Sequence, residues 1–211
     1  MAADRSMNVI IHAAFKRDMS RFEDALARFP AGSTARAAEL GRAWQFFTTE
    51  LHHHHESEET LFFEAFRELG GTDQLVTELK GEHADLIIAL DTADAAMRAL
   101  GEDPTTEHAA TARNAVTKLH ETFETHIAHE ERESEPLLLN NLDAPALKRA
   151  EKQVRREQGL VGGGRFLAWL QDGGTADNAA ALRATIPRPV LFVFGRLVGR
   201  SYTRDIGSVW A

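Results

Sequence analysis

Histidines and carboxylates are the residues of this sequence that could carry out chemistry, because it contains ten histidines and no cysteine. The lack of cysteine excludes disulfide bonds, thiolate zinc sites, iron–sulfur clusters and a cysteine nucleophile. Imidazole and carboxylate groups together suit iron, manganese or zinc. Function is therefore expected to depend on where the fold places the histidines.

Four histidines lie on apolar stripes whose residues are spaced three or four apart, which is the spacing of one helical face. They are His12, His54, His83 and His126. Two of them have a glutamate four residues later, about 6 Å along the same face: Glu58 follows His54, and Glu130 follows His126. Four inward imidazoles with two inward carboxylates predict a dinuclear metal site, in which the carboxylates bridge two ions and each ion receives two imidazoles.

The alternative is that the two glutamates lie at the boundary of the core and pair with nearby arginine or lysine, because an unpaired buried carboxylate is costly. Two familiar metal motifs are incomplete. The His-Glu pairs at His55 and His129 lack the second histidine of a zincin helix. A ferritin-like di-iron site needs Glu-x-x-His on two helices, and the sequence has only Glu50-Leu51-His52-His53.

Four segments with helical periodicity must position these residues, and almost nothing in the sequence resembles a strand. The expected helices are residues 6–28, 33–69, 72–101 and 105–136. Proline or glycine separates them, and Pro136 is expected to bend or stop the fourth. Long helices with short connections predict an all-α, up-down-up-down four-helix bundle over residues 1–141.

Residues 142–211 are expected to form a helical C-terminal extension. Its predicted helices are residues 144–158 and 166–170, with Gly162-Gly163-Gly164 as a flexible joint between them. An apolar stretch containing arginines then follows Ile186-Pro187-Arg188-Pro189, and its Gly195 and Gly199 are spaced for a close helix contact. We expect this last helix to contact the bundle, or its copy in a homodimer, in preference to a membrane.

Composition and charge exclude several classes of partner. The 32 acidic residues outnumber the 24 basic ones, and a net charge of −8 argues against electrostatic binding of nucleic acid or anionic lipid. The N-terminus has no signal-peptide pattern, and the longest apolar run, residues 190–194, is far shorter than the roughly 20 residues that span a bilayer. We therefore expect a cytoplasmic protein that binds neither nucleic acid nor membrane.

Residues 8–139 resemble the hemerythrin family, in particular its HHE cation-binding branch. The matching pieces are Ile10-Ile11-His12-Ala13-Ala14-Phe15, His54-His55-Glu56-Ser57-Glu58-Glu59-Thr60-Leu61-Phe62, Glu82-His83-Ala84-Asp85-Leu86, His126-Ile127-Ala128-His129-Glu130-Glu131 and Pro136-Leu137-Leu138. The resemblance implies a non-haem di-iron centre, and the donor chemistry allows zinc or manganese as substitutes for iron. It also implies that Glu58 and Glu130 are the bridges and that the four inward histidines are terminal ligands.

One difference from the oxygen-carrying hemerythrins affects this expectation. Those proteins have a second histidine one turn after the third-helix histidine, and this sequence has Ile87 there. His55, Glu59 or His129 could supply the missing ligand, although His55 is rotated about 100° from His54 around the helix. The remaining histidines are expected at the surface or around the ligands: His52, His53, His108 and His120.

The resemblance and the missing ligand leave three functions open. The first is a module that binds or senses dioxygen, nitric oxide or iron and signals through the extension. The second is a di-iron enzyme that consumes hydrogen peroxide, which the loss of a ligand at Ile87 would favour. The third is iron storage or a zinc-containing structural bundle.

Overall fold

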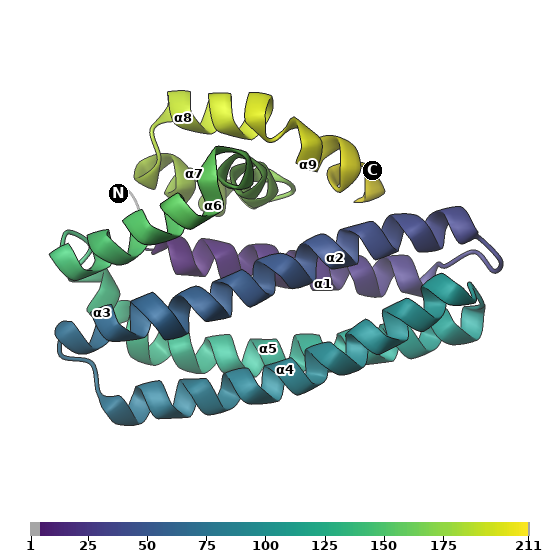
Figure 1. Cartoon of the computed structure of the whole chain (residues 1–211), viewed down its shortest axis with the longest axis horizontal. Coiled ribbons are helices and arrows are strands. Elements are labelled where there is room, and N and C mark those ends of the chain that lie inside the picture. The colour runs from purple at the N-terminus through teal and green to yellow at the C-terminus, as the bar shows by residue number, and fades with distance from the viewer. Residues whose placement is uncertain (1–4, 211) are drawn as a thin grey trace.

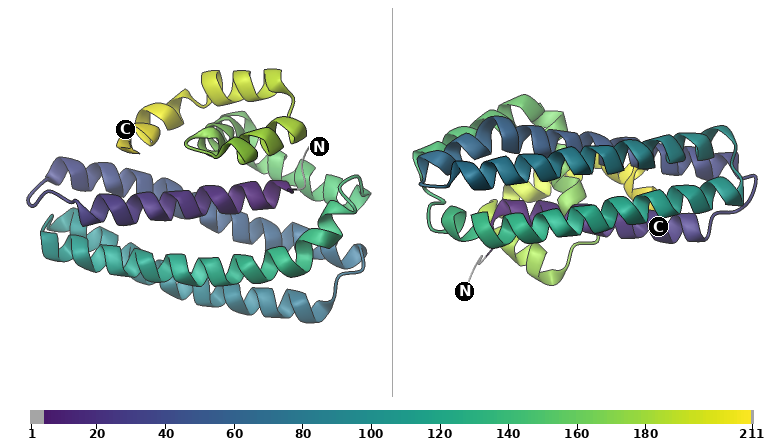
Figure 2. Two further views of the ribbon diagram at one scale, coloured as in Figure 1. Left: turned by 180° about the vertical axis from the view of Figure 1, so that it is seen from behind. Right: turned by 90° about the horizontal axis from the view of Figure 1, so that it is seen from below.

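The structure is a computed structural model that describes residues 5–210. The described residues form helices and turns without any strand, so the predicted all-α class is confirmed. Figure 1 shows a bundle of long antiparallel helices with a layer of further helices on one side of it. This layer is the C-terminal extension, and it lies against the α1 and α2 side of the bundle, with α4 and α5 on the far side (Figure 2).

The bundle has the up-down-up-down order that the sequence predicts. Its helices are α1 (Met7–Ala27), α2 (Thr34–Ser57), α4 (Asp73–Glu102) and α5 (Thr106–Leu139), and α2 continues through a π-helical turn, η1 (Glu58–Phe62), into α3 (Phe63–Glu68). The helices begin at residues whose hydroxyl groups accept a hydrogen bond from the first turn. These N-caps are Ser6, Ser33, Thr72 and Thr105.

Pro136 does not stop the fourth helix, because α5 runs on to Leu139 with this proline inside it. A proline in a helix leaves the carbonyl four residues earlier without its backbone donor. That carbonyl belongs to Arg132, and both Arg132 and Pro136 are exposed. The proline therefore lies on the solvent-facing side of α5, and the helix continues beyond it to Leu139.

The extension differs from its prediction at the expected glycine joint. It consists of α6 (Pro145–Gln171), α7 (Ala176–Thr185), α8 (Arg188–Phe192), the π-helical η2 (Val193–Val198), α9 (Arg200–Asp205) and the 3₁₀ turn η3 (Gly207–Trp210). Gly162-Gly163-Gly164 is helical, and the chain kinks instead at Gly159, which has a φ of 63° that favours glycine. The sequence did not predict α7.

The helix α6 packs closely against the last helices of the extension at Gly164 and Gly199. A Cβ atom on Gly199 would lie 2.5 Å from the Gly164 carbonyl oxygen and 2.6 Å from Cβ of Ala168. Only a residue without a side chain fits at this crossing of η2 and α9 over α6. The final helical stretch therefore contacts α6 directly, and α6 lies between part of it and the bundle (Figure 1).

Three aromatic side chains of the extension pack on phenylalanines of the bundle. The pairs are Trp169 with Phe15, Trp210 with Phe22 and Tyr202 with Phe46, with ring centroids 4.9, 4.9 and 5.2 Å apart. A buried carboxylate fixes the same interface, because Asp18 accepts a hydrogen bond of 2.7 Å from Nε1 of Trp169. One hydrophobic core therefore runs through the bundle and the extension.

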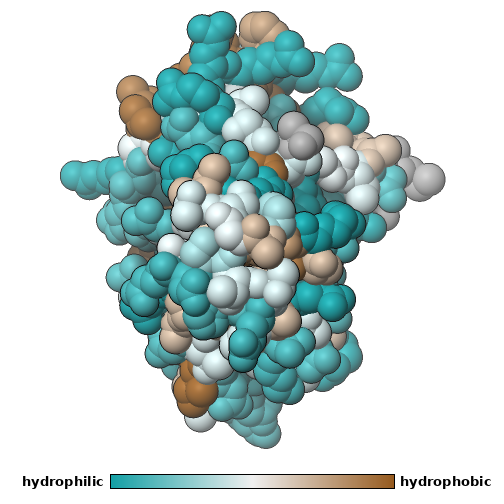
Figure 3. All heavy atoms as spheres, turned by 90° about the vertical axis from the view of Figure 1, so that its right-hand side faces the viewer, coloured by the Kyte–Doolittle hydropathy of each residue, from teal (hydrophilic) through white to brown (hydrophobic). Residues whose placement is uncertain are grey.

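None of the helices described is long and apolar enough to cross a membrane. The end of the molecule shown in Figure 3 is largely hydrophilic, with only scattered hydrophobic residues.

Candidate metal centre

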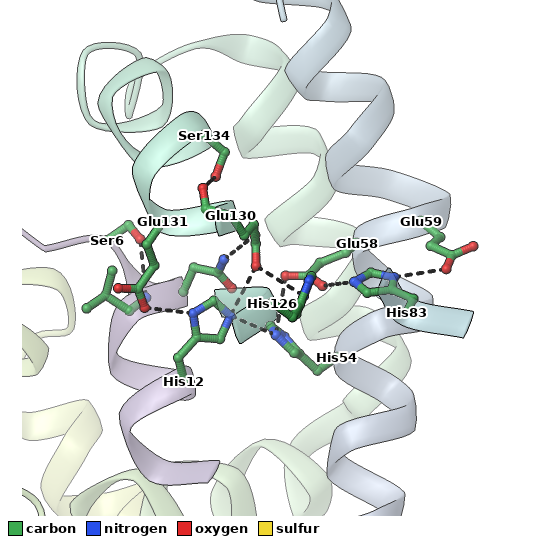
Figure 4. A network of polar contacts seen from close by, with 12 residues as sticks. Ser6, His12, His54, Glu58, Glu59, His83, His126, Glu130, Glu131 and Ser134 are labelled. Carbon is green, nitrogen blue, oxygen red and sulfur yellow. Dashed lines mark hydrogen bonds and ion pairs between the residues drawn. The ribbon is translucent and has the colours of Figure 1, made fainter. Parts of the chain in front are cut away.

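The structure brings together all six residues that the sequence predicts for the site. They come from α1, α2, η1, α4 and α5 and meet inside the bundle: His12, His54, Glu58, His83, His126 and Glu130 (Figure 4). His12 is 0% exposed, and each of the two glutamates is 4% exposed. The alternative in which these glutamates pair with arginine or lysine is wrong, because the ion pairs found for them among residues 5–210 involve only histidines.

Glu58 lies between two groups of imidazoles. Its Oε1 atom is 3.3 Å from Nε2 of His54, and its Oε2 atom is 3.4 Å from Nε2 of His83. On the Oε1 side, Nε2 of His12 lies 3.1 Å from Nε2 of His54. The two carboxylate oxygens therefore face two different points in the core, as a bridging ligand would.

Two overlapping sets of donor atoms result. The first consists of His12, His54 and Glu58, and the second of His55, Glu58, His83 and His126. Within each set the potential ligand atoms all lie within 4.8 Å of one another. Glu58 belongs to both sets, and the second set contains His55 in addition to the two histidines predicted for it.

Glu130 faces both sets through a single oxygen. Its Oε2 atom is 3.4 Å from Nε2 of His12 and 3.7 Å from Nε2 of His126. The other oxygen, Oε1, accepts a hydrogen bond of 2.8 Å from the side-chain amide of Asn8. No pattern in the sequence pointed to Asn8, which reaches this carboxylate from the first turn of α1.

Most of the inward-facing polar atoms have no hydrogen-bond partner in the described part of the chain. The buried atoms without a hydrogen bond include both oxygens of Glu58, Oε2 of Glu130 and Nε2 of His55, His83 and His126. Burying such groups without partners is unfavourable. Their concentration at one place is the pattern that a bound cation would satisfy, so the donor set fits a metal centre.

Burial also shifts the pKa values of these groups. It raises the pKa of Glu58 to about 8 and holds that of Glu130 well above its ordinary value, with the Glu58 charge adding to the effect on Glu130. Burial lowers the pKa of His126 to about 4 and that of His12 well below its usual range. The imidazoles of His12 and His126 are therefore neutral at physiological pH, which is the form that binds metals.

Carboxylates outside the cluster hold the outer nitrogens of three imidazoles. The Nδ1 atoms of His12, His83 and His126 lie 2.9, 2.9 and 2.8 Å from carboxylate oxygens of Glu131, Glu59 and Glu82, respectively. Because an ionised carboxylate only accepts hydrogen bonds, each Nδ1 carries the proton and each Nε2 presents a lone pair to the interior. Such partners orient histidine ligands and make them more basic.

The candidates for the missing ligand occupy different places. His55 is only 7% exposed and lies in the cluster, although the argument from helical rotation placed it off this face. The sequence contained a signal for it, because Phe47, Leu51 and His55 are spaced four apart along the buried stripe of α2. Glu59 instead binds Nδ1 of His83, and Nδ1 of His129 lies 2.6 Å from Glu82.

The other expected positions agree with the structure. His52 and His53 are exposed, while the partly exposed His108 and His120 bind Asp103 and Glu23 away from the cluster. Ile87, one turn after His83, is 43% exposed.

Comparison with known families agrees with this geometry. Residues 10–138 match the hemerythrin HHE cation binding domain, so the chain belongs to the hemerythrin family. No curated protein and no solved structure matches the chain. The match covers the bundle and all six predicted site residues, and it ends before the extension.

Proposed function

We propose that this member of the hemerythrin family holds two iron ions, with Glu58 and Glu130 between them and His12, His54, His83 and His126 as terminal ligands. The observation that carries the proposal is that the two oxygens of Glu58 face two separate groups of imidazoles, at 3.3 and 3.4 Å. An iron pair supplies reversible electron transfer and sites for small ligands. Zinc and manganese suit the same donors and are the main competitors for the site.

The small ligand that we propose is a diatomic molecule, dioxygen or nitric oxide. Phenylalanine rings adjoin the histidines and make the surroundings apolar. The ring pairs are Phe15 with His54, Phe123 with His12 and Phe63 with His83, with centroids 5.5, 5.9 and 5.8 Å apart. An uncharged diatomic molecule loses little hydration on entering such surroundings, whereas a hydrated anion loses much more.

The extension offers a route by which ligand binding could be sensed. Trp169 of α6 packs on Phe15, and Phe15 packs on the imidazole of His54, so the extension is one side chain away from the centre. A change in the position of His54 would alter the packing of Trp169. This continuity favours a sensing role over simple storage.

Consumption of hydrogen peroxide is a second candidate function. The observation that favours it is the outward position of Ile87, which provides no donor where the oxygen carriers have a histidine. A centre with fewer protein ligands leaves more positions for a reacting molecule.

Anaerobic loading with ferrous iron tests these proposals. We expect two irons per chain, a new absorption band on exposure to dioxygen or nitric oxide, and a change in tryptophan fluorescence. Binding of fewer than two irons, or of zinc alone, would contradict the di-iron proposal. Oxygen evolution from peroxide above that of a Glu58→Ala variant would instead support the enzyme.

A further inference from the structure

His55 lies among the proposed ligands of one ion, in a position that requires explanation. Its ring stacks on that of His83, with centroids 4.3 Å apart and an interplanar angle of 21°, and it lies edge-on to His126 at 5.9 Å. Its Nε2 atom is buried and has no hydrogen-bond partner among the described residues. A buried imidazole nitrogen without a partner is costly, so a purely structural role leaves this atom unexplained.

We infer that His55 is a fifth imidazole ligand, which binds the same ion as His83 and His126. This inference rests on the proposed dinuclear centre. The two ions then differ in their protein donors: three imidazoles with Glu58 at one ion, and two imidazoles with Glu58 at the other, while Glu130 faces both.

The helix around His55 explains how it reaches the cluster. His55 continues the buried stripe of Phe47 and Leu51 and lies three residues before Glu58. The π-helical turn η1 begins at Glu58, and such wider turns inside helices are frequent at functional sites. Within one turn, α2 and η1 therefore contribute His54 to the first set of donors, His55 to the second, and Glu58 to both.

This ligand changes the interpretation of Ile87. The sequence lacks the family's fifth histidine on the third bundle helix, and α2 supplies an imidazole to the same cluster from a different direction. The number of histidines at the centre is then five, with three at one ion and two at the other. The missing ligand at Ile87 then no longer supports peroxide consumption, and the binding of a small ligand is favoured.

Titration with cobalt(II) tests the inference in the full-length chain. We expect the wild-type protein and the His53→Ala variant to bind two cobalt ions, because His53 is exposed on the same helix. The His55→Ala variant should bind one ion with its affinity nearly unchanged and the other about tenfold more weakly or worse, since even loss of a partner that only orients a ligand costs about 10- to 100-fold. Circular dichroism shows whether each variant retains the helical fold.

A His55→Gly variant tests whether His55 binds the metal or only fills space in the core. Added imidazole should restore tight binding of the second cobalt ion and its visible absorption, which a role limited to filling space would not produce. Two ions bound with unchanged affinity in His55→Ala, or no recovery with imidazole, would overturn the inference while leaving the dinuclear proposal intact. Fewer than two ions in the wild-type protein would overturn both.

Discussion

The imidazole of His83 is held between two consecutive glutamates. Its Nδ1 atom lies 2.9 Å from Oε1 of Glu59, and its Nε2 atom lies 3.4 Å from Oε2 of Glu58. The same arrangement occurs at His12, whose Nδ1 and Nε2 atoms face Glu131 and Glu130 at 2.9 and 3.4 Å. In each Glu-Glu pair, the first side chain points into the centre and the second fixes a histidine on another helix.

The glutamates that bind the Nδ1 atoms of these histidines should therefore control metal affinity without touching the metal. They are Glu59, Glu82 and Glu131. Glu59→Gln removes the charge that favours a proton on Nδ1 of His83, and we expect metal binding to weaken about 10- to 100-fold. Competition with a chromophoric chelator measures this change. Glu56→Gln is the matched control, because Glu56 is exposed on the same helix and should bind metal like the wild-type protein. Equal affinities for the two variants would contradict the assigned role of Glu59.

Removal of the metal should lower the melting temperature. A ligand that binds only the folded chain stabilises it by about 2.7 kcal/mol when its concentration is 100 times its Kd. For a chain of this size, that corresponds to a difference of roughly 5–10 °C between chelated and metal-loaded protein in calorimetry. The Glu58→Ala variant should show little of this difference. Identical melting curves with and without metal in the wild-type protein would be incompatible with a site inside the bundle.

Glu50 should make stability depend on pH. Burial raises the pKa of this carboxyl to about 7, while the charge of Arg165 acts in the opposite direction. An unfolded chain ionises Glu50 near its ordinary pKa of 4.5, so between about pH 4.5 and 7 the folded state binds more protons and loses stability as the pH rises. Glu50→Gln removes this loss, and its advantage over the wild-type protein should grow across that window by about 1–3 kcal/mol.

Urea unfolding at a series of pH values measures the effect of Glu50. Glu56→Gln again serves as the control, because Glu56 is exposed and its substitution should not change the slope with pH. If the difference in free energy of unfolding between Glu50→Gln and the wild-type protein stayed constant across the pH series, Glu50 would be better solvated than the structure indicates.

Two glycines of the extension should respond to alanine in opposite directions. Gly199→Ala places a methyl group against the Gly164 carbonyl and Ala168, so the crossing of the helices must open and the protein should lose stability by about 1–3 kcal/mol. Gly163 is helical, and a Cβ atom added to it would have no neighbour within 4 Å, so Gly163→Ala should stabilise by about 0.5–1 kcal/mol. Thermal unfolding measures the melting temperatures of the two variants. A change of the same sign in both, relative to the wild-type protein, would contradict this packing.

Periodicity along the sequence was sufficient to predict the bundle and the convergence of its six inward residues. Each of these residues is fixed by its own helix, and its stripe of apolar neighbours is visible in a single segment. The outer carboxylates were beyond this reasoning, because Glu82 and Glu131 bind histidines on other helices and only the packing of those helices pairs them. The hydrogen bond between Asn8 and Glu130 could not be predicted from the sequence for the same reason.

The predictions from sequence that the structure contradicts failed for identifiable physical reasons. The prediction centred the buried stripe of α2 on His54, whereas the spacing of Phe47 and Leu51 points to His55. The prediction of a joint at the glycine triplet rested on the intrinsic flexibility of glycine, but Gly164 lies in a helix that packs closely against residues more than thirty positions later. Pro136 would break a buried helix, and its exposure made it tolerable.

The packing of the extension on α1 and α2 has a consequence for truncation. A chain cut after residue 141 would lose the rings that cover Phe15, Phe22 and Phe46, and would leave Asp18 without its indole donor. The shortened protein would keep every proposed metal ligand and still present a newly wetted aromatic surface beside His54. Its tendency to aggregate would then say nothing about the metal, and a soluble minimal version would need polar replacements on that surface.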